Sequence, residues 1–396
     1  MSTADDISPV YRFVDLFAGI GGFRRGFERT LYPGGGEGFV CVGSAENDKY
    51  AASTYAHLYG DDPTADVSSE TFKKTMENTP YDVLCGGFPC QTFSRAGLQE
   101  GFRNTTKGTL FFDVADIVQR TEPKAFLLEN VDNLLSHDKG KTFATILHTL
   151  VAELGYTIIG VNLLDDDPVR IGYAKSDLVV NSRNFRVPQN RPRVYLMGFS
   201  ASTVERVGGE EYLPVATPKK SLLPALYPSV REVLDPHPAD ELFLSSGAWQ
   251  SMQAHRARHS GKGNGFGYII VNRDNGEYPV SNALLATGGS GKERNLIYDP
   301  SRPELAGTWT KGKKTPVNSD GVRYMSPMEW GRLQGFVDYA FKDAATGADR
   351  FSFPANMSAT QQYKMFGNAV TVPVVEEMAA MMLDVLGAAY STNPGR

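Results

Sequence analysis

The stretch VDLFAGIGGF at residues 14–23 decides the fold that this sequence predicts. It begins with the apolar residues of a buried strand, and glycines follow at Gly19, Gly21 and Gly22, before the helix-like FRRGFE. Glycine lets the main chain turn tightly and lets a ligand approach it closely. The stretch therefore predicts a strand, a tight turn and a helix, with the turn accessible to a ligand.

Similar apolar runs recur on the C-terminal side of this stretch. They are FVCVGSAE at 39–46, YDVLCGGF at 81–88, AFLLENV at 125–131, YTIIGVNLL at 156–164 and RVYLMGF at 193–199. Amphipathic or polar segments separate them, which is typical of a parallel α/β sheet. From about residue 204 to 321 this alternation stops and glycine, proline, serine and basic residues dominate. We expect a first domain at 1–205, a loop-rich second domain with a hinge at 206–335, and a segment at 336–396 that returns to the first domain.

The composition is that of a globular protein. Of 396 residues, 41% are hydrophobic and 21% are charged. No apolar run approaches the roughly 20 residues that cross a bilayer, and the first residues do not resemble a signal peptide. We therefore expect no membrane association and a cytoplasmic location. Three cysteines are too few for a disulfide framework or a zinc site, so we expect reduced thiols and no metal.

The charge is distributed unevenly. The whole chain has a net charge of −5, which by itself argues against a nucleic-acid partner. Residues 249–332, however, contain 12 basic and 7 acidic side chains, which leaves 28 basic and 38 acidic elsewhere. One segment of the second domain is therefore basic and suited to binding the phosphate groups of a nucleic acid.

Three residues at the ends of apolar runs have side chains suited to chemistry. Glu46 ends one run, where a carboxylate can accept the hydroxyl protons of a ribose, although it could equally cap the helix that follows. Cys90 follows Pro89 in a loop after another run, whereas Cys41 and Cys85 lie within runs and are expected to be small core residues. Glu129 ends a third run. A thiol and a carboxylate at the ends of parallel strands could face one substrate.

Six motifs occur in a fixed order: DLFAGIGGF, GGFPCQTFS, ENV, QNRPR, RLQGF and GNAV. In this order they resemble the cytosine-5 DNA methyltransferases of bacterial and phage type II restriction-modification systems. The resemblance implies a Rossmann-like sheet with helices on both faces, S-adenosylmethionine as methyl donor and S-adenosylhomocysteine as product. It implies cofactor contacts by Phe17, Gly19, Gly21, Gly22, Glu46, Asp66, Val67 and Asn368. It implies catalytic roles for Cys90 as nucleophile and for Glu129, Gln189, Arg191 and Arg193. Asn47 stands where many members have an aromatic residue, which puts stacking on the adenine in doubt.

The basic segment corresponds to the target-recognition domain of that family. Its glycine-rich stretches suit contacts with base edges and phosphates of double-stranded DNA. The candidate DNA-binding residues are Arg256, Arg258, Lys262 and Arg294. GKGNGFGY resembles a subgroup that reads sites beginning CC and ending GG, whereas Ala283 before Leu284 departs from the Thr-Leu pair common there. The resemblance also implies a monomer that shares its cell with a restriction endonuclease without a stable complex. It places the protein in the bacterial cytoplasm or nucleoid.

Three alternatives remain. Transfer-RNA methylation would use the same catalytic residues, but that branch has a shorter insert with a different pattern. A catalytically silent DNA-binding homologue is disfavoured because Cys90, Glu129 and both arginines are present. A nicotinamide-dependent oxidoreductase would explain the glycine turn but neither PCQ nor QNRPR.

Overall fold

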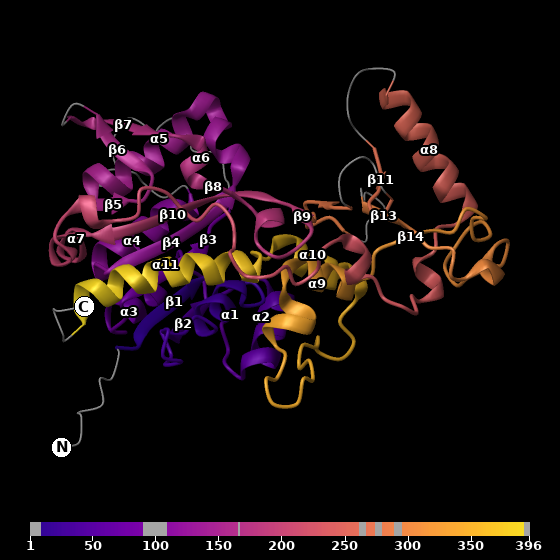
Figure 1. The fold of residues 1–396 in the computed structure, drawn as a ribbon, viewed down its shortest axis with the longest axis horizontal. Coiled ribbons are helices and arrows are strands. Elements are labelled where there is room, and N and C mark those ends of the chain that lie inside the picture. The colour runs from indigo at the N-terminus through magenta and orange to yellow at the C-terminus, as the bar shows by residue number, and fades with distance from the viewer. Residues whose placement is uncertain are drawn as a thin grey trace. The chain divides into compact units, whose positions relative to one another are not determined.

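The computed structural model describes residues 9–89, 109–164, 167–260, 267–273, 279–288 and 295–391, and Figure 1 shows its fold. The chain divides into two compact units. The first consists of residues 1–181, 192–221 and 370–396, and the second of 182–191 and 222–369. These boundaries differ from the three ranges expected from sequence. Residues 206–221 fall in the first unit, and residues 336–369 fall in the second.

A seven-stranded sheet forms the centre of the first unit, in the order β2-β1-β3-β4-β10-β5, with β8 also paired to β10. Its strands are β1 (Tyr11–Leu16), β2 (Phe39–Ala45), β3 (Val83–Gly87), β4 (Ala125–Val131), β5 (Tyr156–Ile158), β8 (Val179–Asn181) and β10 (Pro192–Ser200). Strands β2, β1, β3 and β4 are mutually parallel, so their carboxyl ends share one edge. This edge is where open α/β sheets bind ligands.

The structure confirms the predicted fold class and differs from the predicted parallel sheet in the direction of one strand. β10 runs antiparallel to β4, β5 and β8. Its apolar run indicates burial but does not indicate direction. A separate hairpin, β6 (Val161–Leu164) with β7 (Asp167–Tyr173), also interrupts the alternation of strand and helix.

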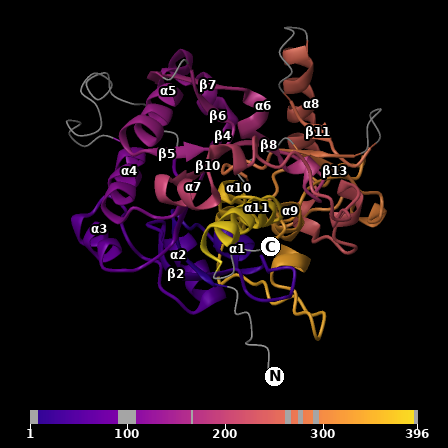
Figure 2. The same ribbon diagram turned by 60° about the vertical axis from the view of Figure 1, so that its left-hand side comes forward.

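Helices cover both faces of this sheet. They are α1 (Gly22–Glu28), α2 (Lys49–Tyr59), α3 (Glu70–Glu77), α4 (Leu110–Thr121), α5 (Lys141–His148), α6 (Lys175–Leu178), α7 (Ala201–Val207) and α11 (Val372–Tyr390). Val14 and Leu84 belong to a core shared with α3, α4 and α5. On the other face, Phe13 packs on Phe27 of α1, and the Tyr11 hydroxyl donates to the Leu386 carbonyl of α11. The two layers lie on either side of the sheet in Figure 2. Burial on both faces explains why the strands are almost continuously apolar.

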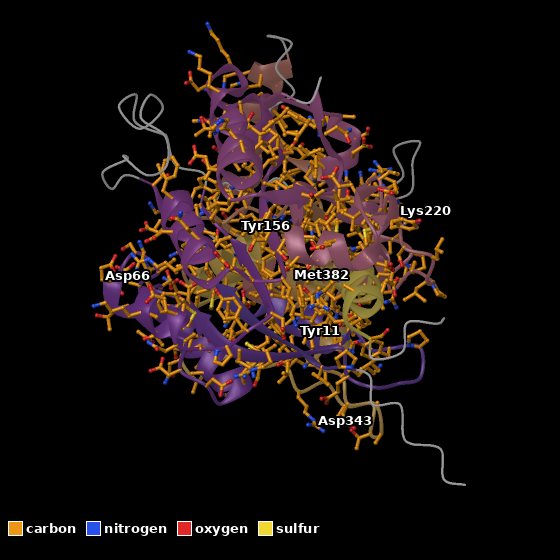
Figure 3. All side chains as sticks on the ribbon, turned by 90° about the vertical axis from the view of Figure 1, so that its left-hand side faces the viewer. Tyr11, Asp66, Tyr156, Lys220, Asp343 and Met382 are labelled. Atoms are coloured by element: carbon orange, nitrogen blue, oxygen red, sulfur yellow. The ribbon has the colours of Figure 1, made fainter. Side chains whose placement is uncertain are left out.

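Figure 3 shows the contrast between this interior and the surface of the first unit. Tyr11, Tyr156 and Met382 lie inside, each at most 5% exposed, whereas Asp66 lies at the periphery. Among the described residues, no helix is both long enough and apolar enough to cross a membrane.

The second unit has a smaller core and short strands. Its elements are β9 (Gln189–Asn190), α8 (Ser246–Ser260), β11 (Ile269–Ile270), β12 (Ser281–Asn282), β13 (Asn295–Tyr298), β14 (Val322–Tyr324), α9 (Pro327–Gln334) and α10 (Ala359–Asn368). Its core also contains an ionic network, in which the fully buried Arg323 pairs with Asp299 at 2.7 Å and with Glu329 at 2.8 Å. A buried charge needs such partners, so this network fixes the segments that carry them.

Candidate active site

Glu46 links the end of β2 to the glycine turn after β1. Its carboxylate accepts hydrogen bonds from the main-chain amides of Gly19 at 2.8 Å and Asp48 at 2.7 Å. Asp48 in turn caps helix α2. The ligand and cap interpretations of Glu46 are therefore compatible, because each carboxylate oxygen has two lone pairs and can accept a second proton.

The glycines of the turn have different surroundings. Gly19 has φ +56°, and a Cβ built there would have no atom of the described residues within 4 Å, so these residues leave space beside it for a ligand. Gly21 has φ +80°, and a Cβ there would lie 2.3 Å from the Tyr59 hydroxyl oxygen. Gly22 is buried at the start of α1, and Phe17 has a positive φ of 55°. Gly19 thus suits ligand contact, whereas Gly21 permits the close packing of α2 on the turn.

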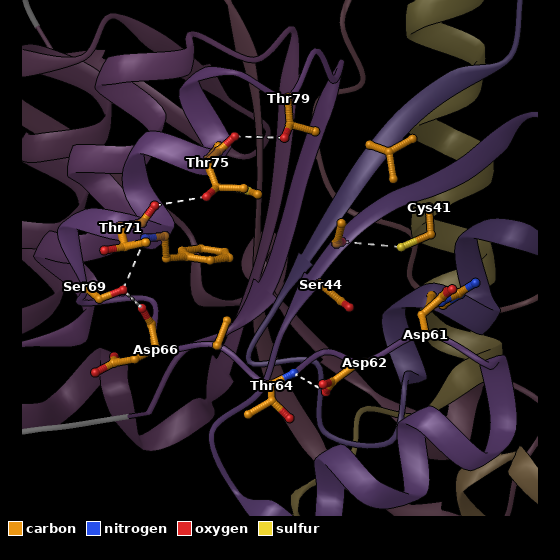
Figure 4. A pocket seen from close by; sticks show the side chains of 16 residues that line it. Cys41, Ser44, Asp61, Asp62, Thr64, Asp66, Ser69, Thr71, Thr75 and Thr79 are labelled. Atoms are coloured by element: carbon orange, nitrogen blue, oxygen red, sulfur yellow. Dashed lines mark hydrogen bonds and ion pairs between the residues drawn. The ribbon is translucent and has the colours of Figure 1, made fainter.

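Asp66 and Val67 follow the loop after α2. The Ser68 hydroxyl and amide donate to the Asp66 carboxylate at 2.7 and 2.9 Å, and these hydrogen bonds lower its pKa. Val67 is buried in the core. Asp66 also lines a pocket of about 620 Å³ at the β2 edge of the sheet (Figure 4). Phe17, Gly19 and Glu46 are not among its lining residues, but its lining residue Ala65 donates its main-chain amide to the Glu46 carbonyl at 3.3 Å.

These surroundings fit the S-adenosylmethionine that the sequence resemblance implies. The space beside Gly19 is open, and the Glu46 carboxylate can accept hydroxyl protons. Asn368, also expected at the cofactor, ends α10 in the second unit with an exposed side chain. Its contact with the cofactor stays a prediction.

A buried carboxyl lies beneath the turn. Asp15 is 0% exposed, and its Oδ2 accepts a hydrogen bond from the Arg24 amide at 3.3 Å. Its Oδ1 has no hydrogen-bond partner within the described part of the chain. Burial raises the pKa of Asp15 to about 8. The carboxyl is therefore mainly protonated at neutral pH and adds little negative charge beneath the turn.

Glu129 and Arg193 form an ion pair at the ends of two neighbouring strands. The Arg193 Nε atom lies 3.0 Å from Glu129 Oε1, and the side chains are 14% and 11% exposed. β4 supplies the carboxylate and β10 the guanidinium, and antiparallel pairing places Arg193 opposite Val131. The structure thus brings together two of the predicted catalytic residues.

Asn130 is a residue that sequence reasoning did not select. It is 4% exposed, and its side-chain amide donates to the Phe88 carbonyl at 2.8 Å. Phe88 stands two positions before Cys90. Asn130 therefore fixes the chain at the start of the predicted nucleophile loop, and the only sequence signal for it was its place beside Glu129.

Cys90 itself lies outside the described residues, so its role stays a prediction. Cys85 is fully buried, its thiol donates to the Val14 carbonyl at 3.2 Å, and burial raises its pKa. Cys41 is only partly buried and lines the pocket of Figure 4, and burial raises its pKa to about 11. A nucleophile must be a thiolate, so neither thiol is suited to that role.

Gln189 and Arg191 lie in the second unit and are 0% and 3% exposed. Arg191 donates to the carbonyls of Leu284, Gly367 and Ala369 at 2.9–3.1 Å. The structure therefore places main-chain groups around this guanidinium. Arg193, two residues later, belongs to the first unit.

Arg256 and Arg258 lie on the last turns of α8 with exposed side chains. The Arg256 guanidinium stacks over the Tyr268 ring at 4.9 Å, and Tyr268 packs against Trp249. Lys262 and Arg294, the other candidates for DNA binding, lie outside the described residues.

Several solved structures have the same fold. A DNMT2 variant from Spodoptera frugiperda matches with a TM-score of 0.60 and 15% identity, over 94% of this chain and 99% of that one. A methyltransferase from Entamoeba histolytica matches with a TM-score of 0.59 and 15% identity, over 96% and 99%. At this identity the likeness shows the fold alone.

Sequence comparison shows the family. The family described as C-5 cytosine-specific DNA methylase matches residues 11–384. The type II methyltransferase M.HpaII of Haemophilus parainfluenzae is 38% identical over 380 residues, which cover 96% of this chain and 91% of that protein. The type II methyltransferase M1.ScrFI of Lactococcus lactis subsp. cremoris is 36% identical, over 95% and 79%. The chain therefore belongs to the C-5 cytosine-specific DNA methylases.

Proposed function

We propose that this protein methylates carbon 5 of a cytosine within one specific sequence of double-stranded DNA, with Cys90 as the nucleophile. The observation that carries the proposal is the Glu129–Arg193 ion pair of 3.0 Å, together with the hydrogen bond by which Asn130 holds Phe88, two positions before Cys90. A carboxyl group and a thiol are the two groups that activation of a cytosine ring requires.

The proposed chemistry follows from the low electron density at carbon 5 of the cytosine ring. Carbon 5 of cytosine is a weak nucleophile until an addition at carbon 6 supplies electron density. The Cys90 thiolate forms a bond to carbon 6 while Glu129 delivers a proton to ring nitrogen 3, and the resulting enamine is nucleophilic at carbon 5. S-adenosylmethionine supplies the electrophilic methyl group. Loss of the proton from carbon 5 then restores the ring double bond and expels the thiolate. The proton on ring nitrogen 3 returns to Glu129 when the thiolate leaves.

Arg193 orients Glu129 in this scheme. Its guanidinium forms the ion pair with Glu129 Oε1 and so holds the carboxyl group at the end of β4. In ordinary duplex DNA the ring atoms of the base are inaccessible. The target base must therefore leave the stack, at a cost of about a few kcal/mol.

Sequence reading is assigned to residues 206–335, the proposed recognition domain with its hinge. The support is the excess of basic residues in 249–332 and the exposure of Arg256 and Arg258 on α8. Arginine can donate two hydrogen bonds to guanine in the major groove. Lys262 and Arg294 are proposed as further contacts, and a site beginning CC and ending GG as the target.

The two relatives described above are named type II methyltransferases, and on this likeness we propose that this enzyme protects DNA within a restriction-modification system. We propose that it works in the cytoplasm as a monomer and that a cognate endonuclease shares its site without a stable complex. Size-exclusion chromatography with light scattering, alone and with the endonuclease, tests the last two statements.

The test of the proposed function is methyl transfer from labelled S-adenosylmethionine to duplex DNA and to transfer RNA, with Cys90→Ser as control. We expect transfer to duplex DNA only, and none by Cys90→Ser, because a hydroxyl is a far weaker nucleophile than a thiolate. Labelling of transfer RNA alone would assign the RNA branch. Label transferred by Cys90→Ser would remove Cys90 from the mechanism.

A further inference from the structure

In the second unit, the segment of residues 284–288 is fixed at both of its ends and exposed between them. Leu284 and Gly288 are buried, whereas the three residues between them are exposed, Leu285 by 43%. The preceding strand, β12, pairs in parallel with β9, the strand that begins the QNRPR motif. The 284–288 segment therefore presents a short exposed turn on a fixed base.

Two buried side chains of the QNRPR motif bind both main-chain groups of Leu284. Its amide donates to Gln189 Oε1 at 3.2 Å, and its carbonyl accepts from Arg191 Nη1 at 3.0 Å. These two bonds fix the main chain at Leu284 through both its amide and its carbonyl group. They do not depend on the nature of its side chain.

The same two side chains connect this segment to α9 and α10. Arg191 Nη2 donates to the carbonyls of Gly367 and Ala369 at 3.1 and 2.9 Å. Gln189 Nε2 donates to Gln334 Oε1 at 3.2 Å, and Gln334 donates to the Ala369 carbonyl at 3.0 Å. One buried network thus joins the 284–288 segment to the C-terminal end of α10.

Gly367 provides the space that this arrangement needs. A Cβ built there would lie 2.5 Å from the Ala286 amide nitrogen and 2.6 Å from the Leu285 carbonyl oxygen. Both atoms belong to the main chain, so a side chain at 367 would displace the turn itself. The exposed turn therefore lies directly against the main chain of α10.

We propose that Arg191 is a positioning residue for DNA recognition: it fixes the 284–288 segment, against Gly367, in the conformation that contacts the duplex. Binding is tighter and more selective when a contact loop is already ordered before its partner arrives. The proposal rests on the proposed function, in which the second unit reads the sequence. It assigns Arg191 to the recognition step, whereas Arg193 acts at the reacting base.

The experiment compares wild type, Gly367→Ala, Arg191→Lys and Gly387→Ala. Gly387 is the matched control because it too lies in a helix, and a Cβ there would be 3.9 Å from its nearest neighbour, an ordinary contact. The recognition sequence is first read by sequencing methylated DNA from the expressing host. Each variant is then assayed for kcat and KM on the cognate duplex and on duplexes with one altered base pair, and for binding of S-adenosylhomocysteine.

We expect Gly367→Ala to raise KM for DNA and to reduce discrimination between cognate and altered sites by about tenfold or more, the ratio that one hydrogen bond to a charged donor represents. Arg191→Lys should give an intermediate loss, because lysine keeps the charge but not the planar geometry. S-adenosylhomocysteine binding should not change in either variant, and Gly387→Ala should resemble wild type.

Two results would overturn the proposal. The first is a folded Gly367→Ala variant whose KM for DNA and discrimination between sites equal those of wild type. If Gly367→Ala does not fold, the same result in folded Arg191→Lys would overturn the proposal. The other is a fall in kcat alone for Arg191→Lys, which would place Arg191 at the reacting base. Failure of the proposed function would be seen separately, as a wild type that methylates no defined duplex sequence.

Discussion

Replacing Glu129 with glutamine removes the charge that faces Arg193 but keeps the shape of the side chain. The two groups lie 3.0 Å apart with little exposure, 11% and 14%. In such surroundings unit charges about 4 Å apart attract by about 4 kcal/mol before the cost of desolvation. After this cost, a hydrogen bond to a charged group makes a net contribution of about 1.5–3 kcal/mol. We therefore expect a coupling of about 2 kcal/mol between Glu129 and Arg193.

The assay is a double-mutant cycle on kcat for cognate duplex DNA, using Glu129→Gln, Arg193→Ala and the double variant. Glu129→Gln should slow the chemical step by about a hundredfold or more and leave cofactor binding unchanged, because an amide can still hydrogen-bond to the ring but cannot supply the proton that favours attack at carbon 6. Arg193→Ala should then cost much less in the Glu129→Gln background than in wild type. Effects that add within about 0.5 kcal/mol would show that the pair does not act as a unit.

Three further predictions concern the turn and the recognition helix. Asp15→Asn should remove one pH-dependent contribution to the free energy of unfolding. The neutral Asp15 carboxyl contributes fully below its unfolded pKa near 3.8, and this contribution is lost as the pH rises through its folded pKa of about 8. Denaturant titrations from pH 5 to 9 measure the free energy of unfolding at each pH. The same change of this free energy with pH in wild type and Asp15→Asn would contradict the prediction. Gly21→Ala should cost about 1–3 kcal/mol more than Gly60→Ala, since both have φ near +80° but only the Gly21 Cβ would collide with Tyr59; equal losses in thermal denaturation would refute the packing role. Arg256→Ala should relax sequence preference by about 1–3 kcal/mol in DNA-binding assays, and a uniform loss on all sequences would assign it to phosphate instead.

The sheet could be predicted because both of its faces are buried. Continuous apolar runs such as AFLLENV mark each central strand whatever its neighbours. The antiparallel direction of β10 could not be predicted, because direction depends on the path of the chain between strands. Residues 182–191 belong to the second compact unit, and the sequence does not indicate this because the segment is too short to show a change in composition.

The site could be predicted at the level of residue types but not of contacts. Glu46 was identified from its place at a strand end, but its two amide donors were not. The Asn130 contact joins groups 42 positions apart in the chain, and no local pattern indicates it. Likewise, the carbonyl groups around Arg191 come from distant segments. Main-chain acceptors are present at every residue, so only the folded structure selects among them.

The central claim is that Cys90 attacks the target cytosine, and trapping the attack tests it most directly. A duplex with 5-fluorocytosine at the target position should form a stable adduct in the presence of S-adenosylmethionine, because fluorine cannot leave carbon 5 as a proton does. Proteolysis and mass spectrometry then locate the modified residue. The account predicts one adduct, on Cys90, and none in Cys90→Ser. An adduct on Cys41 or Cys85, or methylation that continues without any adduct, would contradict it.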